Sequence, residues 1–237
     1  MTNLAFISMA YKMTALQLMI GEANFFAQHL NLSTPHPIQI TNITYSYVSP
    51  PVFGFGGVID TTNFDFSFYK EGKLWQIANK IEQYGNVERY PEWKKSPSLI
   101  DNKGAYQLAT QWLYAVSVDV PSLEKKFKAH ITQPFHYDPP HSEHKEYLPV
   151  YEVKWGDDEH PAVNVTILGT TKELMILVFN DLTFSKRPPL VIPNAGQLAS
   201  RPDPVVKKFQ SAVAAVTNSH SELIPLRSPD PQRQPSP

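Results

Sequence analysis

The sequence predicts an α+β protein with two similar halves, in each of which a helix packs on an antiparallel sheet. Two stretches of helical apolar spacing, at residues 8–30 and 102–116, predict the helices. Each is followed by short apolar runs separated by turn residues, which is typical of antiparallel strands. The 237 residues, 42% of them hydrophobic, suffice for one large core or two small ones. The repeated order of elements suggests a duplication.

The first half is predicted to occupy residues 1–84. Its apolar residues recur three or four apart at first and then alternate, so a helix should precede the strands. The predicted elements are a helix at residues 8–30, a strand with one change of phase at 38–47, a tight Pro- and Gly-rich loop at 50–57 and a hairpin at 64–78.

An aromatic stripe marks this hairpin. Phe64, Phe66 and Phe68 alternate with polar residues on its first strand, and Trp75 lies on its second. Such a face must be covered by something apolar, so we expect it to form core beneath the first helix. A ligand groove is the alternative, because binding sites are usually apolar pockets with few polar groups.

The second half is predicted to span residues 101–182, after an aperiodic linker at 85–100. Asp101 or Asn102 can cap its first helix, and Asp119 followed by Pro121 predicts a second helical start. The predicted elements are a helix at residues 102–116, a short helix after 119, and an antiparallel meander of strands at 147–155, 162–168 and 173–179.

A C-terminal extension is predicted at residues 183–226, and a disordered tail at 227–237. Asp203 followed by Pro204 predicts one more helix in the extension. The tail has four prolines among polar residues, so it cannot bury enough apolar area to offset the entropy of ordering.

Composition narrows the range of partners. A net charge of -1, without a local cluster of Lys and Arg, gives no basic field for nucleic acid. The absence of cysteine excludes disulfides and thiolate metal sites. No apolar run approaches about 20 residues, so no membrane span is predicted. The N-terminus lacks the basic lead of a secretory signal.

One cluster of imidazoles and carboxylates predicts a metal site. It comprises His136, His141 and His144, with Asp138, Glu143 and Glu146 around them. These ligand types suit zinc, which would lower the pKa of a bound water and make it a nucleophile. The alternative is a solvated loop, since short His-rich tracts are compositional hints.

Two further groups have a functional and a plain interpretation. Phe53 and Phe55, in the Gly-rich loop, could present aromatic surface to a protein or peptide partner, or the loop could simply let backbones approach closely. The loop does not open a helix, so it is no dinucleotide fingerprint. Residues 157–160 pair carboxylates as acid–base sites do, but an exposed acidic hairpin turn explains them better.

Parts of the chain resemble known families. Residues 148–153 and 163–174, after the helix at 102–116, resemble PepSY and cystatin-like domains, in which one helix lies across an antiparallel sheet. Residues 53–57, 111–113, 171–174 and 185–188 are similar to segments of an uncharacterised bacterial family. That resemblance implies no assigned activity and an extracytoplasmic location.

Two functional hypotheses follow. The first is a non-enzymatic binding or inhibitory module that offers a sheet face or edge to a protein or peptide, as edge-strand addition would allow. The second is a metal-dependent hydrolase that uses His136, His141 and His144.

Overall fold

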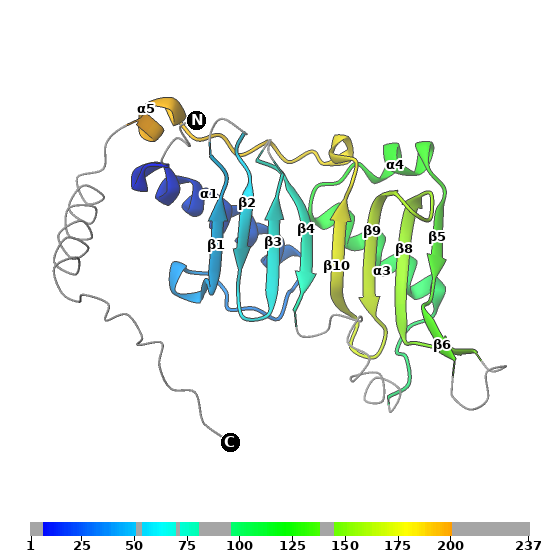
Figure 1. Ribbon diagram of the computed structural model, residues 1–237. Coiled ribbons are helices and arrows are strands. Elements are labelled where there is room, and N and C mark those ends of the chain that lie inside the picture. The colour runs from blue at the N-terminus through cyan, green and yellow to red at the C-terminus, as the bar shows by residue number, and fades with distance from the viewer. Residues whose placement is uncertain (1–6, 51–53, 70–71, 81–95, 138–144, 201–237) are drawn as a thin grey trace, which may run out of the picture.

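The computed structural model describes residues 7–50, 54–69, 72–80, 96–137 and 145–200, and it contains one eight-stranded antiparallel sheet with its long helices on one face (Figure 1). The α+β class predicted from the sequence is therefore confirmed. In chain order the elements are α1 (Met9–His29), η1 (Ile40–Asn42), β1 (Tyr45–Val48), β2 (Gly57–Asp60), β3 (Phe64–Phe68), β4 (Leu74–Asn79), α3 (Asn102–Ala115), α4 (Val120–Lys126), β5 (Ala129–Thr132), β6 (Phe135–Tyr137), β7 (Lys145–Tyr147), β8 (Val150–Gly156), β9 (Pro161–Leu168), β10 (Glu173–Phe179), η4 (Leu182–Phe184) and α5 (Ala195–Ser200).

The strand order is β1-β2-β3-β4-β10-β9-β8-β5, and β6 and β7 form a separate small hairpin. The first strand series, β1–β4, and the second strand series, β5 with β8–β10, meet at the centre of the sheet. There β4 pairs with β10, and Ile77 lies opposite Leu177. Strands far apart in the chain thus continue one sheet. Among the described residues, β1 and β5 are its two outer strands.

α1 begins and ends where local chemistry favours it. The Ser8 side chain accepts a hydrogen bond from the N–H of Tyr11 at 3.2 Å and caps the helix. On its apolar face, Met19, Ala23 and Phe26 are at most 2% exposed. The chain then turns at Asn31, whose φ of 50° is tolerated by asparagine.

The strand predicted at residues 38–47 is wrong in its first part. Residues 40–42 form the short 3-10 helix η1, and β1 begins only at Tyr45. The Asn42 side chain accepts from the N–H of Gln39 at 2.8 Å, and Asn24 of α1 bonds both backbone groups of Ile38. These side-chain bonds take up the backbone groups that a strand ladder would have used.

The predicted hairpin of β3 and β4 is confirmed, and its aromatic stripe belongs to the core. Phe64, Phe66 and Phe68 are at most 4% exposed. Trp75 does not oppose them, because β4 carries a bulge and pairs Leu74 with Phe68. Trp75 is the additional residue and stays half-buried.

The second strand series contains elements that the sequence patterns missed. α3 and α4 are confirmed, capped by Asp101 and Asp119, and β8, β9 and β10 form the predicted meander. β5 and the β6–β7 hairpin were not predicted. β5 has only four residues, all half-buried, so it lacks the alternation that reveals a strand.

The segment after β10 runs back along one end of strands β4 to β1 to α5, which lies beside the start of α1 (Figure 1). The Arg187 guanidinium stacks on the Phe25 ring at 3.7 Å and forms a bidentate ion pair with Glu22, a residue of α1 that is 6% exposed. The N–H of Leu190 donates to the carbonyl of Gly72 at 3.0 Å. This segment therefore fastens the end of the second strand series to the first.

Several predicted segments lie outside the described residues. These are most of the linker at 85–100, the helix expected after Asp203 and the tail at 227–237. Among the described residues, the helices are all too short or too polar to cross a bilayer.

Candidate functional site

The outer strand β1 presents aromatic side chains to solvent. Within the described residues β1 pairs only with β2, and Tyr47 lies opposite Val58. Tyr45 and Tyr47 are 56% and 49% exposed, and Ile40 just before the strand is 50% exposed. Three of the nine exposed large hydrophobic residues in the described chain therefore gather within eight positions, at one edge of the sheet.

The outward-facing backbone of this edge can be identified from the ladder. The N–H of Ser49 donates to the carbonyl of Gly56 at 2.9 Å, so Ser49 faces β2. Alternate residues of an antiparallel strand face the same neighbour, and so Tyr45 and Tyr47 also direct their backbone groups to β2. Ser46 and Val48 then direct theirs to the outer side, where no described strand pairs with them.

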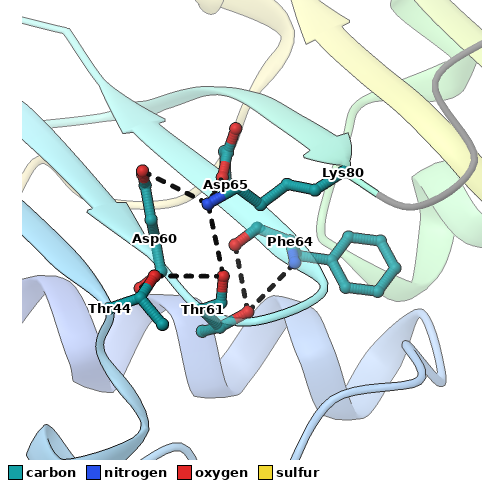
Figure 2. A network of polar contacts seen from close by, with 6 residues as sticks. All are labelled: Thr44, Asp60, Thr61, Phe64, Asp65 and Lys80. Carbon is teal, nitrogen blue, oxygen red and sulfur yellow. Dashed lines mark hydrogen bonds and ion pairs between the residues drawn. The ribbon is translucent and has the colours of Figure 1, made fainter. Parts of the chain in front are cut away.

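A charged network lies directly behind the edge (Figure 2). Asp60 of β2 lies opposite Asp65 of β3, and like charges in this position are destabilising unless compensated. Lys80 compensates them, because its Nζ lies 3.4 Å from Asp60 Oδ2 and 3.0 Å from Asp65 Oδ1. Thr44 joins β1 to the network by donating to the carbonyl of Asp60 at 3.2 Å. The network thus holds the first three strands together at one end.

Burial and charge shift the titration of this network. Burial raises the pKa of Asp65, and the nearby Asp60 carboxylate raises it further, which together outweigh the bond from Lys80. Burial lowers the pKa of Lys80, but the bond to Asp65 and the charges of both carboxylates raise it more, so its net pKa is above the usual value. The arrangement is that of a partly buried charge cluster with one cation for two anions.

Replacing Lys80 with methionine should destabilise the protein by about 1–2 kcal/mol at pH 7, because the half-exposed cation compensates two carboxylates. Without Lys80 the pKa of Asp65 should rise further. A carboxyl with a raised native pKa binds more protons in the native than in the unfolded state, so stability increases as pH falls through that window. The deficit of the variant should therefore shrink between pH 7 and about pH 4, which urea denaturation at both pH values measures.

The control for this prediction is Lys103→Met, on the exposed side of α3. It should change the free energy of unfolding by less than about 0.5 kcal/mol at either pH. A deficit for Lys80→Met that stays constant with pH would show that Asp65 does not respond to Lys80.

Lysine residues lie beside the opposite edge strand, β5. Lys125 and Lys126 end α4, and Lys128 directly precedes β5. Lys126 pairs with Asp181 at 3.4 Å and lies over the rings of Phe127 and Phe184. Lysines beside a sheet edge discourage pairing with another chain, and Lys128 lies next to β5, whereas residues 43–49 at β1 carry no charge.

A cavity of about 340 Å³ lies where the end of α1 meets α3, and we call it the inter-helix cavity. It is lined at its rim by Asn31, Ser33 and the β9–β10 turn. Its apolar lining consists of Leu30, Leu32, Phe64, Leu108, Trp112 and Leu174. Of the predicted aromatic stripe, only Phe64 contributes to it.

The predicted metal cluster lies almost wholly outside the described residues. His136 belongs to β6, opposite Glu146 of β7, but only its backbone is described; His141 and His144 fall between the two strands, where nothing is described. Among the residues whose side chains are described, no group of three metal-binding side chains occurs. The zinc site and the hydrolase therefore stay predictions.

The structure describes only one of the two loop phenylalanines. Phe53 lies outside the described residues, whereas Phe55 is half-buried and packs against the main core. The carbonyl of Phe55 accepts from the N–H of Gly72 at 2.7 Å. Gly72 has a φ of 71°, and a Cβ there would lie 2.5 Å from the carbonyl oxygen of Leu190, so this is a close approach of backbones. Partner binding through Phe53 and Phe55 stays a prediction.

The acidic turn between β8 and β9 is exposed, as expected. The side chain of Asp158 is 76% exposed, and its Oδ1 lies 2.7 Å from His130 Nε2, from which it accepts a hydrogen bond when that nitrogen is protonated. Asp157 accepts from the N–H of His160, which closes the turn. These residues therefore form an exposed hairpin turn between the two strands.

The edge tyrosines were missed as functional residues by the sequence patterns. Tyr45 and Tyr47 were recognised only as strand positions, and nothing local distinguishes an edge strand from a central one. The one available signal was the uncharged run at residues 43–49, since edge strands usually carry a charge or a proline.

Comparison with protein-family models, with curated proteins and with solved structures finds no match to this chain. The resemblance to PepSY and cystatin-like domains and to a bacterial family is therefore neither supported nor opposed by known relatives.

Proposed function

We propose that this protein is a non-enzymatic binding module that takes an extended segment of another protein as an added strand beside β1. The observation that supports this most is an uncharged outer strand with two exposed tyrosines, Tyr45 and Tyr47. Exposed tyrosine is enriched in protein interfaces, where it buries a large area at low entropic cost.

The backbone of β1 supplies the other half of the interaction. The outward N–H and C=O groups of Ser46 and Val48 can bond a partner strand, as in β-augmentation. Alternate side chains of that partner would lie beside Tyr45 and Tyr47 on the face away from α1. Main-chain bonds would then give affinity, and the tyrosines would select the neighbouring side chains.

The contrast with β5 favours β1 as the binding edge. Natural proteins protect edges with lysine, proline or bulges, and Lys128 beside β5 follows this rule. β1 has no charged residue, proline or register shift between Tyr45 and Val48. An edge without protection is expected where it is used.

We also propose that the sheet consists of two helix-plus-sheet units joined edge to edge, as the PepSY and cystatin-like resemblance implies. Each unit would contain one long helix and four strands in a meander, namely α1 with β1–β4 and α3 with β5 and β8–β10. In this proposal β1 and β5 are equivalent outer strands, and only one of them has kept an open edge.

The proposal is tested with a random peptide library displayed on phage and panned against the parent protein and Ser46→Pro. Proline at this position removes an outward N–H but no donor to β2. Enriched peptides should bind the parent at least tenfold tighter than Ser46→Pro, by fluorescence anisotropy. Ser46→Ala keeps the N–H and should bind like the parent.

A second variant keeps the proposal testable if Ser46→Pro fails to fold. Tyr45→Lys with Tyr47→Lys adds charge to the edge and should also abolish binding, whereas Tyr114→Lys, on the exposed side of α3, should not. The proposal is wrong if no peptide is enriched over the proline variant, or if the enriched peptides bind both lysine variants equally.

A further inference from the structure

We infer that the strand added beside β1 carries a basic side chain next to Tyr45, an assignment that rests on the proposed function and adds the charge of the partner to it. The charge network behind the edge carries this inference (Figure 2). Asp60 and Asp65 share one cation, Lys80, whose Nζ lies 3.4 Å from the first carboxylate and 3.0 Å from the second. Two carboxylates with one ammonium leave the network with an excess of one negative charge.

This negative charge lies on the same face of the sheet as the edge tyrosines. Tyr45 is opposite Asp60, and Asp60 is opposite Asp65. Residues that are directly opposite in antiparallel strands have their side chains on one face. Tyr45 and Tyr47 are exposed on this face, whereas Val48 is buried on the other. A partner strand would therefore continue the row, with Tyr45 between its own side chain and Asp60.

The strands next to the edge offer no positive charge of their own. Residues 43–68 contain only two charged side chains, those of Asp60 and Asp65. Burial raises the pKa of Asp65, and the Asp60 carboxylate raises it further. Burial lowers the pKa of Lys80, yet the two carboxylates raise it by more. A second cation near the network would be stabilised by the same excess of negative charge.

The spacing of strands brings a long cationic side chain within range. Tyr45 directs its backbone groups to β2, so an antiparallel partner would meet it at a non-hydrogen-bonded position, where opposing side chains lie closest. With strands about 4.8 Å apart, the facing partner residue would start roughly 10 Å from Asp60. Arginine and lysine extend their charge along a flexible stem, and the 56% exposed Tyr45 supplies a ring face on which a cation can lie. An acidic side chain at this position would be repelled.

The test uses the peptides that the phage library yields on the parent protein. Their consensus should contain a basic residue at one position, and each peptide is synthesised with arginine, citrulline or glutamate there. Citrulline resembles arginine in shape but has no charge. By fluorescence anisotropy at pH 7, the parent should bind the arginine peptide at least fivefold tighter than the citrulline peptide, and the glutamate peptide most weakly. Added salt should reduce the difference between arginine and citrulline.

Asp60→Asn is the decisive variant, because it removes one charge with little change of shape and leaves Lys80 paired with Asp65. It should lower the ratio of arginine to citrulline affinity to less than twofold. Asp158→Asn, in the exposed turn between β8 and β9, is the matched control and should keep the ratio of the parent. Lys80→Met should increase the ratio, which a general loss of structure would not do. Asp65→Asn removes the same charge if Asp60→Asn fails to fold.

The possible results separate this inference from strand addition itself. Enriched peptides without a basic position overturn the inference and leave strand addition at β1 intact. So does an arginine-to-citrulline ratio that stays the same in the folded aspartate variants. If the library yields no peptide on the parent protein, strand addition and the inference are both wrong.

Discussion

Replacing Arg187 with alanine should lower the free energy of unfolding by about 3 kcal/mol, because it leaves the Glu22 carboxylate buried without its partner. The side chain of Glu22 is only 5% exposed, in the middle of α1, while that of Arg187 is 27% exposed. The lower end of the range for broken buried pairs therefore applies. The variant also loses the guanidinium that stacks on Phe25 at 3.7 Å. Urea denaturation followed by circular dichroism measures the change.

The matched control is the adjacent residue. Lys186 pairs with Asp119 at 3.3 Å but its side chain is 63% exposed, so Lys186→Ala should cost less than about 1 kcal/mol. Replacing Glu22 and Arg187 together with leucine should recover much of the loss, since no charge is then left buried. If Arg187→Ala is no more destabilising than Lys186→Ala, the pair does not fasten the C-terminal segment to α1.

Phe66→Ala should be as damaging, with a loss of about 3–5 kcal/mol. Phe66 is fully buried in β3, between Ile59 of β2 and Ile77 of β4, which are also 0% exposed. Truncation leaves a cavity at the centre of a rigid layer that cannot collapse around it. Thermal and urea unfolding should both report the loss.

Tyr45→Ala is the control, because it removes an aromatic side chain of the same sheet that is not buried. Tyr45 lies in the same sheet but is 56% exposed, so its removal should change stability by less than about 0.5 kcal/mol while weakening peptide binding. A Phe66→Ala protein as stable as the parent would contradict the role of Phe66 in packing the core.

Helix ends could be predicted because their causes are local. Ser8, Asp101 and Asp119 each cap a helix through a bond to a backbone N–H three residues on. The β3–β4 hairpin could be predicted equally well, since its alternation of apolar and polar residues lies within one short stretch. The false strand at residues 38–44 came from the same reasoning, because bonds from the distant Asn24 decided that backbone.

The candidate site was harder to predict from the sequence. The inter-helix cavity is formed by residues near positions 30, 64, 110 and 172. These positions lie far apart in the chain, so no local sequence pattern predicts that they come together. The edge at β1 exists only because the other strands pair elsewhere. By contrast, the exposed acidic turn at residues 157–160 was predicted, since a turn is a local structure.

By itself, then, the sequence determined the α+β class, the three capped helices and most strands, because propensity, capping and alternation act over a few residues. Only the tertiary structure decided that β4 and β10 join in one sheet, that β1 and β5 are its edges, and that Glu22 is buried against Arg187. These features depend on pairing between residues far apart in the chain, whose choice of partner is set by the packing of the whole molecule.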